Sequence, residues 1–323
     1  MAILMAFSVV FTAFYGRYKI GDDGVDNSRA EYKGILTLWH VDSFEGGTGS
    51  RKQFLLKSAR GFEKVNQGVL VMVINHTAES VRENVKNGVY PDMISYGAGL
   101  DVNVYSEFDI SKTVSGGMIG DKTYATAWCR GGYVLISNPK LVSEQKKDLE
   151  NLVVSLGDYT QPLVAFALNG YTARHIEVMK PMDAYVRFTG GKTPYFLGTQ
   201  RDVNRLNARG MEYKATPLEE YNDLYQYISI TGIDELKRYY AEEFIRYIVS
   251  ENVQRKLNGI GMLSAFCDAE YDVGTLRDMQ SVKNFSTVSA FTPSAVLKEI
   301  QADSLVAAAG DTETLNKIKK MLL

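Results

Sequence analysis

The chain has 323 residues, and at roughly 150 residues per domain this length predicts about two domains. Hydrophobic residues make up 45% and charged residues 23% of the sequence, which excludes wholesale disorder and a polytopic membrane protein. The 36 basic and 38 acidic side chains give a net charge of -2, so no overall attraction draws the chain to nucleic acid or anionic lipid, although a local patch is still compatible with it. Cys129 and Cys267 can form at most one disulfide, and neither has a metal-type spacing.

The first fifteen residues differ from the rest of the chain. Met1–Tyr15 contains no charged side chain, yet it is shorter than the roughly 20 apolar residues that a membrane-spanning helix needs. A polar stretch from Gly21 to Arg29 follows it. We interpret residues 1–32 as an export signal or signal anchor followed by a linker. This predicts an extracytoplasmic protein, at the cell surface or secreted, which an uncleaved segment would tether to the membrane. The alternative is a buried first strand or helix of the fold.

Alternating strands and helices begin at residue 35. Residues 35–40 form a β-rich run, and Phe54 to Phe62 places apolar residues on one face of a helix. Residues 69–74 are almost wholly apolar, which predicts a parallel strand covered on both faces. A short helix with Val81 and a third strand over 92–96 complete a β-α-β-α-β unit, which is typical of a doubly wound open sheet.

Further strands and helices are predicted after residue 122. In chain order they are strands over 123–128 and 133–137, helices over 143–156 and 162–168, a strand over 194–197, a helix capped by Thr199, a strand over 225–230, a helix over 235–257, and two closing helices that begin near 293 and 312. The helix over 235–257 has the clearest pattern, because apolar residues recur at i, i+3, i+4, i+7 and i+8 from Ala241.

Motifs of enzymes are few. The glycine-rich segment from Gly46 to Lys52 lacks the Gly-Lys-Ser/Thr of a phosphate-binding loop, and no GxSxG or HExxH is present. His40, Asp42 and Glu45 resemble a partial metal site and are also the one candidate for a catalytic pair, but polar residues after a buried strand are the favoured interpretation. We therefore expect no catalytic residue, no metal and no cofactor.

Aromatic residues favour a recognition function. The chain has 20 Tyr, 14 Phe and 2 Trp, and several of them lie at predicted strand ends beside hydrogen-bonding residues, such as Trp39 before His40 and Tyr225 before Gln226. The apolar faces of a sugar ring stack on aromatic rings, while its hydroxyl groups need convergent polar partners. This mixture predicts a carbohydrate ligand.

Ordered motifs between residues 33 and 265 resemble a known family. They are Leu38-Trp39-His40-x-Asp42-x-Phe44-x-Gly46-Gly47, Phe62-Glu63-Lys64-x-Asn66-x-Gly68-Val69, Gly88-x-x-Pro91-Asp92-Met93-Ile94-Ser95, Gly132-Tyr133-x-Leu135-x-x-Asn138, and the helix from Ala241 to Leu257. The combination is similar to extracellular solute-binding proteins of bacterial ABC importers, whose best-known members bind sugars. Two departures are the missing lipobox cysteine and the segment Gly198–Asp202, which is not a general signature of the family.

The resemblance implies an α/β, two-lobe fold of the periplasmic-binding-protein type. Each lobe is expected to be a mostly parallel sheet flanked by helices, with the ligand cleft between the lobes. It assigns 33–128 with about 232–275 to the first lobe and 129–231 with about 276–323 to the second. The chain should then cross between the lobes at least twice.

The resemblance also implies a function without a reaction. The protein would capture a small solute, with a carbohydrate as the expected class, and deliver it to ABC permease subunits as a monomer that binds no nucleic acid. Strand ends of the first lobe, a helix start of the second lobe and an aromatic wall near the crossing supply the expected ligand-binding residues: Trp39, His40, Asp42, Glu45, Asn75, His76, Tyr96, Trp128, Thr199, Gln200, Arg201 and Tyr225. Arg201 also fits an anionic or phosphorylated solute. The alternatives are a two-lobe extracytoplasmic enzyme and a ligand-sensing receptor without a transport role.

Overall fold

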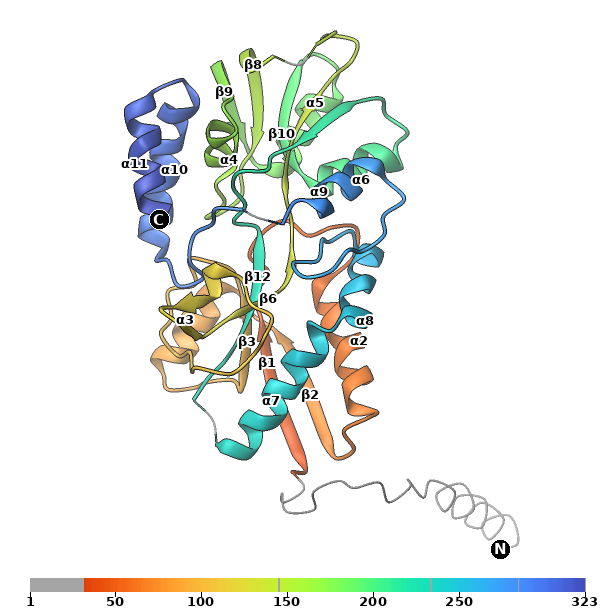
Figure 1. Ribbon diagram of the computed structural model, residues 1–323, viewed down its shortest axis with the longest axis vertical. Coiled ribbons are helices and arrows are strands. Elements are labelled where there is room, and N and C mark those ends of the chain that lie inside the picture. Colours follow the sequence, from red (N-terminus) through yellow and green to blue (C-terminus); the bar gives the residue numbers. More distant parts are fainter. Residues whose placement is uncertain (1–31, 145, 233, 284, 323) are drawn as a thin grey trace, which may run out of the picture. The chain divides into compact units, whose positions relative to one another are not determined.

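The structure, a computed structural model, describes residues 32–144, 146–232, 234–283 and 285–322, so the predicted export segment lies outside the described residues. Two five-stranded sheets form the framework of this part, and helices flank each of them (Figure 1). No helix in the described ranges is long and apolar enough to cross a membrane. Cys129 and Cys267 are both buried free thiols.

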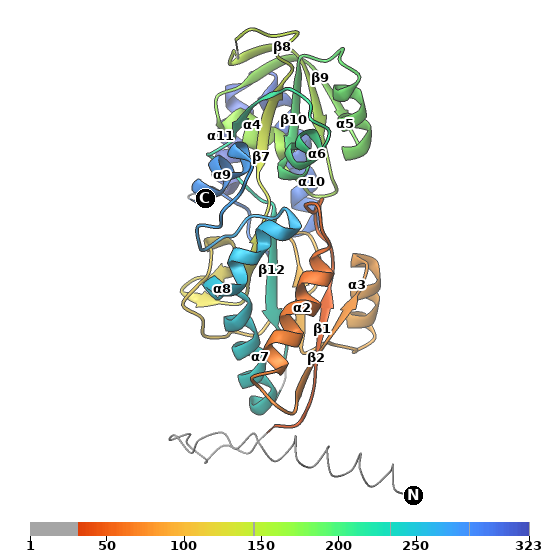
Figure 2. The ribbon, with the colours of Figure 1, turned by 90° about the vertical axis from the view of Figure 1, so that its right-hand side faces the viewer.

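The first sheet has the strand order β2 (Val69–Asn75), β1 (Gly34–His40), β3 (Met93–Tyr96), β12 (Tyr225–Ile230) and β6 (Thr126–Arg130). β1 pairs in parallel with β2 and β3, whereas β12 pairs antiparallel with β3 and β6. Helices α2 (Arg51–Glu63) and α7 (Glu235–Ile248) lie together on one side of this sheet, and α3 (Ala78–Lys86) lies on the other (Figure 2). A 3-10 helix, η1 (Ser115–Gly117), and a hairpin of β4 (Met118–Ile119) and β5 (Lys122–Thr123) precede β6.

The prediction that residues 69–74 are covered on both faces is wrong. β2 is the edge strand of the sheet, and α2 packs on only one of its faces. On the other face Leu70 and Met72 are 54% and 44% exposed, because α3 is short and Val81 is its only buried residue.

The second sheet has the strand order β11 (Lys214–Pro217), β7 (Tyr133–Ser137), β10 (Tyr195–Thr199), β8 (Asp148–Ser155) and β9 (Thr172–Met179). β8 pairs in parallel with β9 and β10, and β7 pairs antiparallel with β10 and β11. Each sheet therefore has two parallel and two antiparallel pairings, where mostly parallel sheets were predicted. The antiparallel pairings arise where the chain enters a sheet as β7 or β12 directly from the other sheet.

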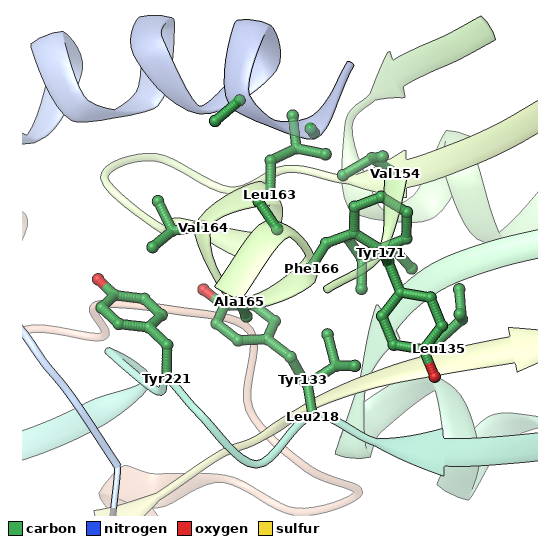
Figure 3. Packing of buried hydrophobic residues seen from close by; sticks show 14 of the residues in the cluster. Tyr133, Leu135, Val154, Leu163, Val164, Ala165, Phe166, Tyr171, Leu218 and Tyr221 are labelled. Atoms are coloured by element: carbon green, nitrogen blue, oxygen red, sulfur yellow. The ribbon is translucent and has the colours of Figure 1, made fainter. Parts of the chain in front are cut away.

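Helices enclose the second sheet. They are α4 (Pro162–Leu168), α5 (Pro181–Thr189), α6 (Gln200–Ala208), α9 (Gly274–Ser281), α10 (Ser294–Ala308) and α11 (Thr312–Leu322). Leu163 and Phe166 of α4 pack with Tyr133, Leu135 and Tyr171 in one hydrophobic cluster (Figure 3). The expected helix starts at Pro162 and Thr199 are confirmed.

Two predicted helices differ from the observed elements. Residues 143–156 were expected to form a helix, but 148–155 form β8, because its apolar end lies between β9 and β10 and is buried on both faces. The helix predicted over 235–257 is divided in the structure. α7 ends at Ile248, and α8 (Glu251–Gln254) and the 3-10 helix η2 (Arg255–Ile260) follow it. The Gln254 amide donates to the Ile248 carbonyl oxygen, which satisfies the end of α7 where the chain turns.

In the described part, the chain passes from one sheet to the other between β6 and β7, between β11 and β12, and between η2 and α9. After α9 it returns to the surroundings of the first sheet, where Ala290 N–H donates to the Gly116 carbonyl oxygen, before α10 packs on α4. β12 belongs to the first sheet, although the sequence placed 129–231 in the second lobe, since this strand pairs with β3 and β6. Buried Arg130 connects the first and third crossings. Its guanidinium donates to the carbonyl oxygens of Ser264 at 3.0 Å, Met279 at 3.0 Å and Val282 at 2.7 Å.

Candidate functional site

A cavity lies where the parallel strands of the first sheet end. Because β1 pairs in parallel with β2 and β3, their carboxyl ends meet at one edge of the sheet. Segments 41–45, 76–79 and 96–100 follow these three strands, and segment 157–159 follows β8 of the second sheet. Together they line a cavity of about 470 Å³, so both sheets contribute to it.

A buried polar network supports the floor of this cavity. The Ser95 hydroxyl lies 3.1 Å from Nδ1 of His40 and accepts hydrogen bonds from Trp128 Nε1 at 2.9 Å and Gln226 Nε2 at 3.1 Å. His40 Nε2 lies 3.1 Å from a carboxylate oxygen of Asp42. All of these side chains except Asp42 are buried, so β1, β3, β6 and β12 are joined by side-chain hydrogen bonds at this edge.

Asp42 faces the cavity and is held ionised. Arg51, the first residue of α2, donates from Nε to Asp42 at 2.8 Å and from Nη2 to the Phe44 carbonyl oxygen. Burial by itself would raise the pKa of Asp42, but the hydrogen bond from His40 and the charge of Arg51 outweigh it and hold this pKa at about 2. The carboxylate therefore serves as a fixed hydrogen-bond acceptor at neutral pH.

An ion pair connects the loop after β1 with the second sheet. Glu45 lies 2.6 Å from Nη1 of Arg201 and 3.8 Å from Nη1 of Arg205, both on α6. The amino end of α6 is fixed by a capping box, in which Thr199 accepts a backbone N–H and the Asp202 carboxylate accepts the N–H of Thr199 at 2.9 Å. Arg201 thus has a carboxylate partner, and it does not line the cavity.

Tyr159 is the aromatic residue that the second sheet contributes to the cavity. Its φ of 60° lies in the left-handed region, which is uncommon for a bulky residue and is found at sites where the surroundings impose it. Gly99 also has a positive φ, of 83°, and a Cβ there would lie 3.1 Å from Cγ of Tyr159. Gly99 therefore lets the tyrosine ring approach the first sheet closely. Phe44 supplies a second ring to the same cavity.

The polar groups of the cavity are mainly acceptors. Carboxylates of Asp42, Glu45, Glu79 and Asp158 line it, and no lysine or arginine does. Burial lowers the pKa of His76, so its ring is uncharged at neutral pH and hydrogen bonds to Ser80 over 3.1 Å. Such a set accepts hydrogen bonds from hydroxyl groups and repels an anion.

The structure brings only part of the predicted ligand-binding set to this cavity. Asp42, Glu45, His76 and Tyr96 line it. Trp39, His40, Trp128, Gln200 and Tyr225 are buried, and Thr199 is a helix cap. Asn75 is exposed at the end of β2 and does not line the cavity.

Trp128 was expected to form an aromatic wall of the cleft, but it lies in the interior. Its exposed fraction is 0%, and it stacks on Phe54 with ring centroids 5.6 Å apart. Trp39 is also buried, with its ring centroid 4.4 Å from that of His76, so it supports the cavity from behind. Sequence reasoning did not select Phe44, Asp158 or Tyr159.

The partial metal site weighed for His40, Asp42 and Glu45 has a different organisation. His40 bonds to Ser95 and Asp42, while Glu45 pairs with α6. No group of three or more metal-ligating side chains that could hold a metal ion occurs within the described ranges.

Comparisons with known proteins identify the fold. No protein-family model matches this chain, and no curated protein does. Among solved structures, the sugar-binding protein MalE from Xanthomonas citri matches with a TM-score of 0.63 and 14% identity over 90% of this chain and 97% of that one. The maltose/maltodextrin-binding domain MalE from Bdellovibrio bacteriovorus, bound to maltotriose, matches with a TM-score of 0.57 and 14% identity over 90% and 98%.

A third solved structure is the GacH receptor of Streptomyces glaucescens, described without ligand and with acarbose. It matches with a TM-score of 0.56 and 14% identity over 90% of this chain and 99% of that one. At these identities the likeness shows the fold. The two-lobe α/β architecture of the periplasmic-binding-protein type, predicted from the sequence motifs, is confirmed.

Proposed function

We propose that this protein is the solute-binding component of an ABC importer and that it binds a neutral carbohydrate between its two sheets. One observation carries the proposal: a cavity built from both sheets combines the rings of Phe44 and Tyr159 with several carboxylates. Aromatic rings suit the C–H faces of sugar rings, and carboxylates accept hydrogen bonds from the hydroxyl groups. Its volume of about 470 Å³ is in the range of pockets for small ligands.

The charge of the cavity favours a neutral sugar over a phosphorylated one. Arg201, the residue considered for an anionic solute, pairs with Glu45 at 2.6 Å and lies outside the cavity. An anion would meet the carboxylates of Asp42 and Asp158 without a cationic side chain on the lining. Maltotriose and acarbose, the ligands of two proteins with this fold, are oligosaccharides or related to them, which supports the same class for this chain.

The binding cycle needs no chemical step. A solute that contacts segments after β1 and β8 together stabilises the arrangement in which the two sheets approach, by its additional affinity for that arrangement. A permease can then recognise the closed form. Asp42, with a pKa of about 2, is unsuited to proton transfer at neutral pH, which supports a binding function over the enzymatic alternative for the His40–Asp42 pair. The proposed location is extracytoplasmic, supported by the uncharged segment Met1–Tyr15.

Isothermal titration of the full chain with maltotriose, glucose and glucose 6-phosphate tests this function. We expect saturable binding of a neutral sugar, no binding of the phosphate ester, and unchanged sugar on chromatography after prolonged incubation. Binding of glucose 6-phosphate alone would contradict the neutral class, and conversion of the sugar would contradict the absence of a reaction. If none of the three binds, a wider screen of neutral oligosaccharides by thermal shift follows, since a ligand raises the melting temperature by mass action.

A further inference from the structure

The face of the first sheet on which α3 lies also carries a group of exposed apolar side chains. We name it the β2 patch: Ile35, Leu70, Met72, Val89 and Tyr90, whose exposed fractions lie between 44% and 54%. Single exposed apolar residues are common on protein surfaces, but contiguous ones mark an interaction site. None of these residues lines the cavity between the sheets.

Strand register makes Ile35, Leu70 and Met72 neighbours on one face. Ile35 of β1 lies opposite Leu70 of β2 in the parallel ladder, and Met72 follows on the same face two residues later. Val89 and Tyr90 come shortly before Asp92, whose backbone N–H donates to the Thr37 carbonyl oxygen at the edge of β1 opposite β2. α3 leaves this half of the face bare, because Val81, its one buried residue, packs nearer the cavity with Trp39 and Ile94.

Lysines border the patch. Lys64 and the 74% exposed Val65 lie in the turn before β2, and Lys86 lies in the last turn of α3. The side chain of Lys33 lies over Gly68 at the start of β1, where a Cβ on that glycine would approach it to 3.0 Å. The nearby carboxylate of Glu63 accepts the Val71 N–H at 2.9 Å. The border of the patch therefore carries Lys33, Lys64 and Lys86 against the carboxylates of Glu63 and of Glu83, which is exposed one turn before Lys86, so lysines outnumber acids there although the whole chain has a net charge of -2.

The chain enters the described part at this same end of the sheet. Lys33 leads directly into β1, and the uncharged segment Met1–Tyr15 is joined to it by residues 16–32. Fully extended, such a linker reaches at most about 60 Å. A membrane that holds the first fifteen residues during or after export would therefore always be within reach of the patch.

We propose that the β2 patch rests on the surface of an anionic lipid bilayer. Its aliphatic side chains and Tyr90 suit the boundary between headgroups and acyl chains, where tyrosine is enriched, and the bordering lysines suit lipid phosphates. This contact would leave the cavity, at the opposite ends of β1 and β2, outside the surface that touches the bilayer. The proposal rests on the extracytoplasmic location given above.

An environment-sensitive label tests the contact in the full chain. The fluorophore NBD is attached to cysteine in V89C, within the patch, and in V186C on α5, a matched control because Val186 is 58% exposed. The native thiols of Cys129 and Cys267 are buried, and wild-type protein treated with the same reagent checks that they do not react. With phosphatidylglycerol vesicles we expect stronger, blue-shifted emission from V89C only. The double substitution K64E/K86E should weaken the affinity for the vesicles, measured by titration of this emission, about fivefold or more per lysine.

Other outcomes would overturn the proposal. Unchanged V89C emission with vesicles, or equal shifts at both sites, would show that the patch does not contact lipid. Blue emission without vesicles would mean that protein covers the patch: a second copy if it rises with protein concentration, and residues 1–31 if it does not. Titration of the same samples with maltotriose separates this result from the proposed function, because the label and K64E/K86E lie outside the cavity.

Discussion

The Ser95 hydroxyl donates its one proton to Nδ1 of His40. Ser95 accepts hydrogen bonds from Trp128 and Gln226, which occupy both of its lone pairs, so its proton is left for the imidazole 3.1 Å away. The Gln226 amide is oriented by its hydrogen bond of 2.8 Å to the Val41 carbonyl oxygen. His40 therefore carries its proton on Nε2 and donates to Asp42, which places the carboxylate in the cavity.

Replacing Ser95 should affect stability more than its small size suggests. In S95A the buried N–H groups of Trp128 and Gln226 lose an acceptor, and unsatisfied buried polar groups cost about 1–3 kcal/mol. We expect the free energy of unfolding in urea to fall by about this amount. S281A, at an exposed serine, is the matched control and should change it by less than about 0.5 kcal/mol. Equal effects of both substitutions would show that the network does not stabilise the fold.

Asp42 should contribute to acid unfolding. Its folded-state pKa of about 2 lies below the unfolded value near 3.8, so its contribution to stability is present above the unfolded pKa and is lost as the pH falls toward 2. In D42N this loss should be absent. Because the carboxylate is 55% exposed, solvent screening limits the difference to about 1 kcal/mol. Urea unfolding of both proteins between about pH 5 and pH 2 measures it, and parallel pH profiles would contradict the assigned pKa.

Tyr159 should be important for sugar affinity. Loss of the ring in Y159A removes the stacking surface from the second sheet, and we expect the dissociation constant of the bound sugar to rise about tenfold or more. Y159F keeps the ring and should stay within about threefold of wild type. Calorimetric titration compares them, with circular dichroism to confirm folding. An affinity of Y159A equal to that of Y159F would exclude stacking at this position.

The Glu45–Arg201 pair should couple salt concentration to affinity. R201Q removes the nearer of the two cationic partners of Glu45 and leaves Arg205 at 3.8 Å, so the loop after β1 is held less firmly while the cavity lining is unchanged. Since both side chains are 30% exposed, we expect at most about a fivefold loss of sugar affinity, and high salt should reduce the difference from wild type. E177Q breaks the ion pair between Glu177 of β9 and Arg187 of α5, neither of which lines the cavity, and should leave the sugar affinity unchanged. An effect of R201Q that persists in high salt would contradict the electrostatic explanation.

Sequence periodicity predicted those elements well whose conformation depends on local side-chain chemistry. The alternation and caps around β1, α2, α6 and β12 come from local chemistry, and their observed bounds lie close to the predicted ranges. The prediction for β8 was wrong because Leu149, Leu152 and Val153 also fit a helical spacing. Only the pairing with β9 and β10 decides between helix and strand. Local sequence does not contain that long-range pairing.

The error at β8 explains the incomplete site. Because 148–155 is a parallel strand, residues 157–159 follow its carboxyl end. A position after the carboxyl end of a parallel strand is also the reason why Asp42, Glu45 and His76 were predicted as site residues. Tyr159 was missed because residues 157–159 were expected to connect two helices, over 143–156 and 162–168. Trp128 was selected for its neighbours in sequence, yet its burial depends on Phe54 and Ser95, which approach it only in the folded sheet.

Arg130 has a mechanical consequence for the molecule. Its strand belongs to the first sheet. Three of its acceptors are the carbonyl groups of Met279 and Gln280 in α9 and of Val282 directly after it, and α9 packs against α6 and β11 of the second sheet. A buried guanidinium bonded to both sides prevents the sheets from sliding past each other, because sliding would strand a charge without partners. The opening and closing that the proposed function requires would then be a rotation with its pivot near this side chain.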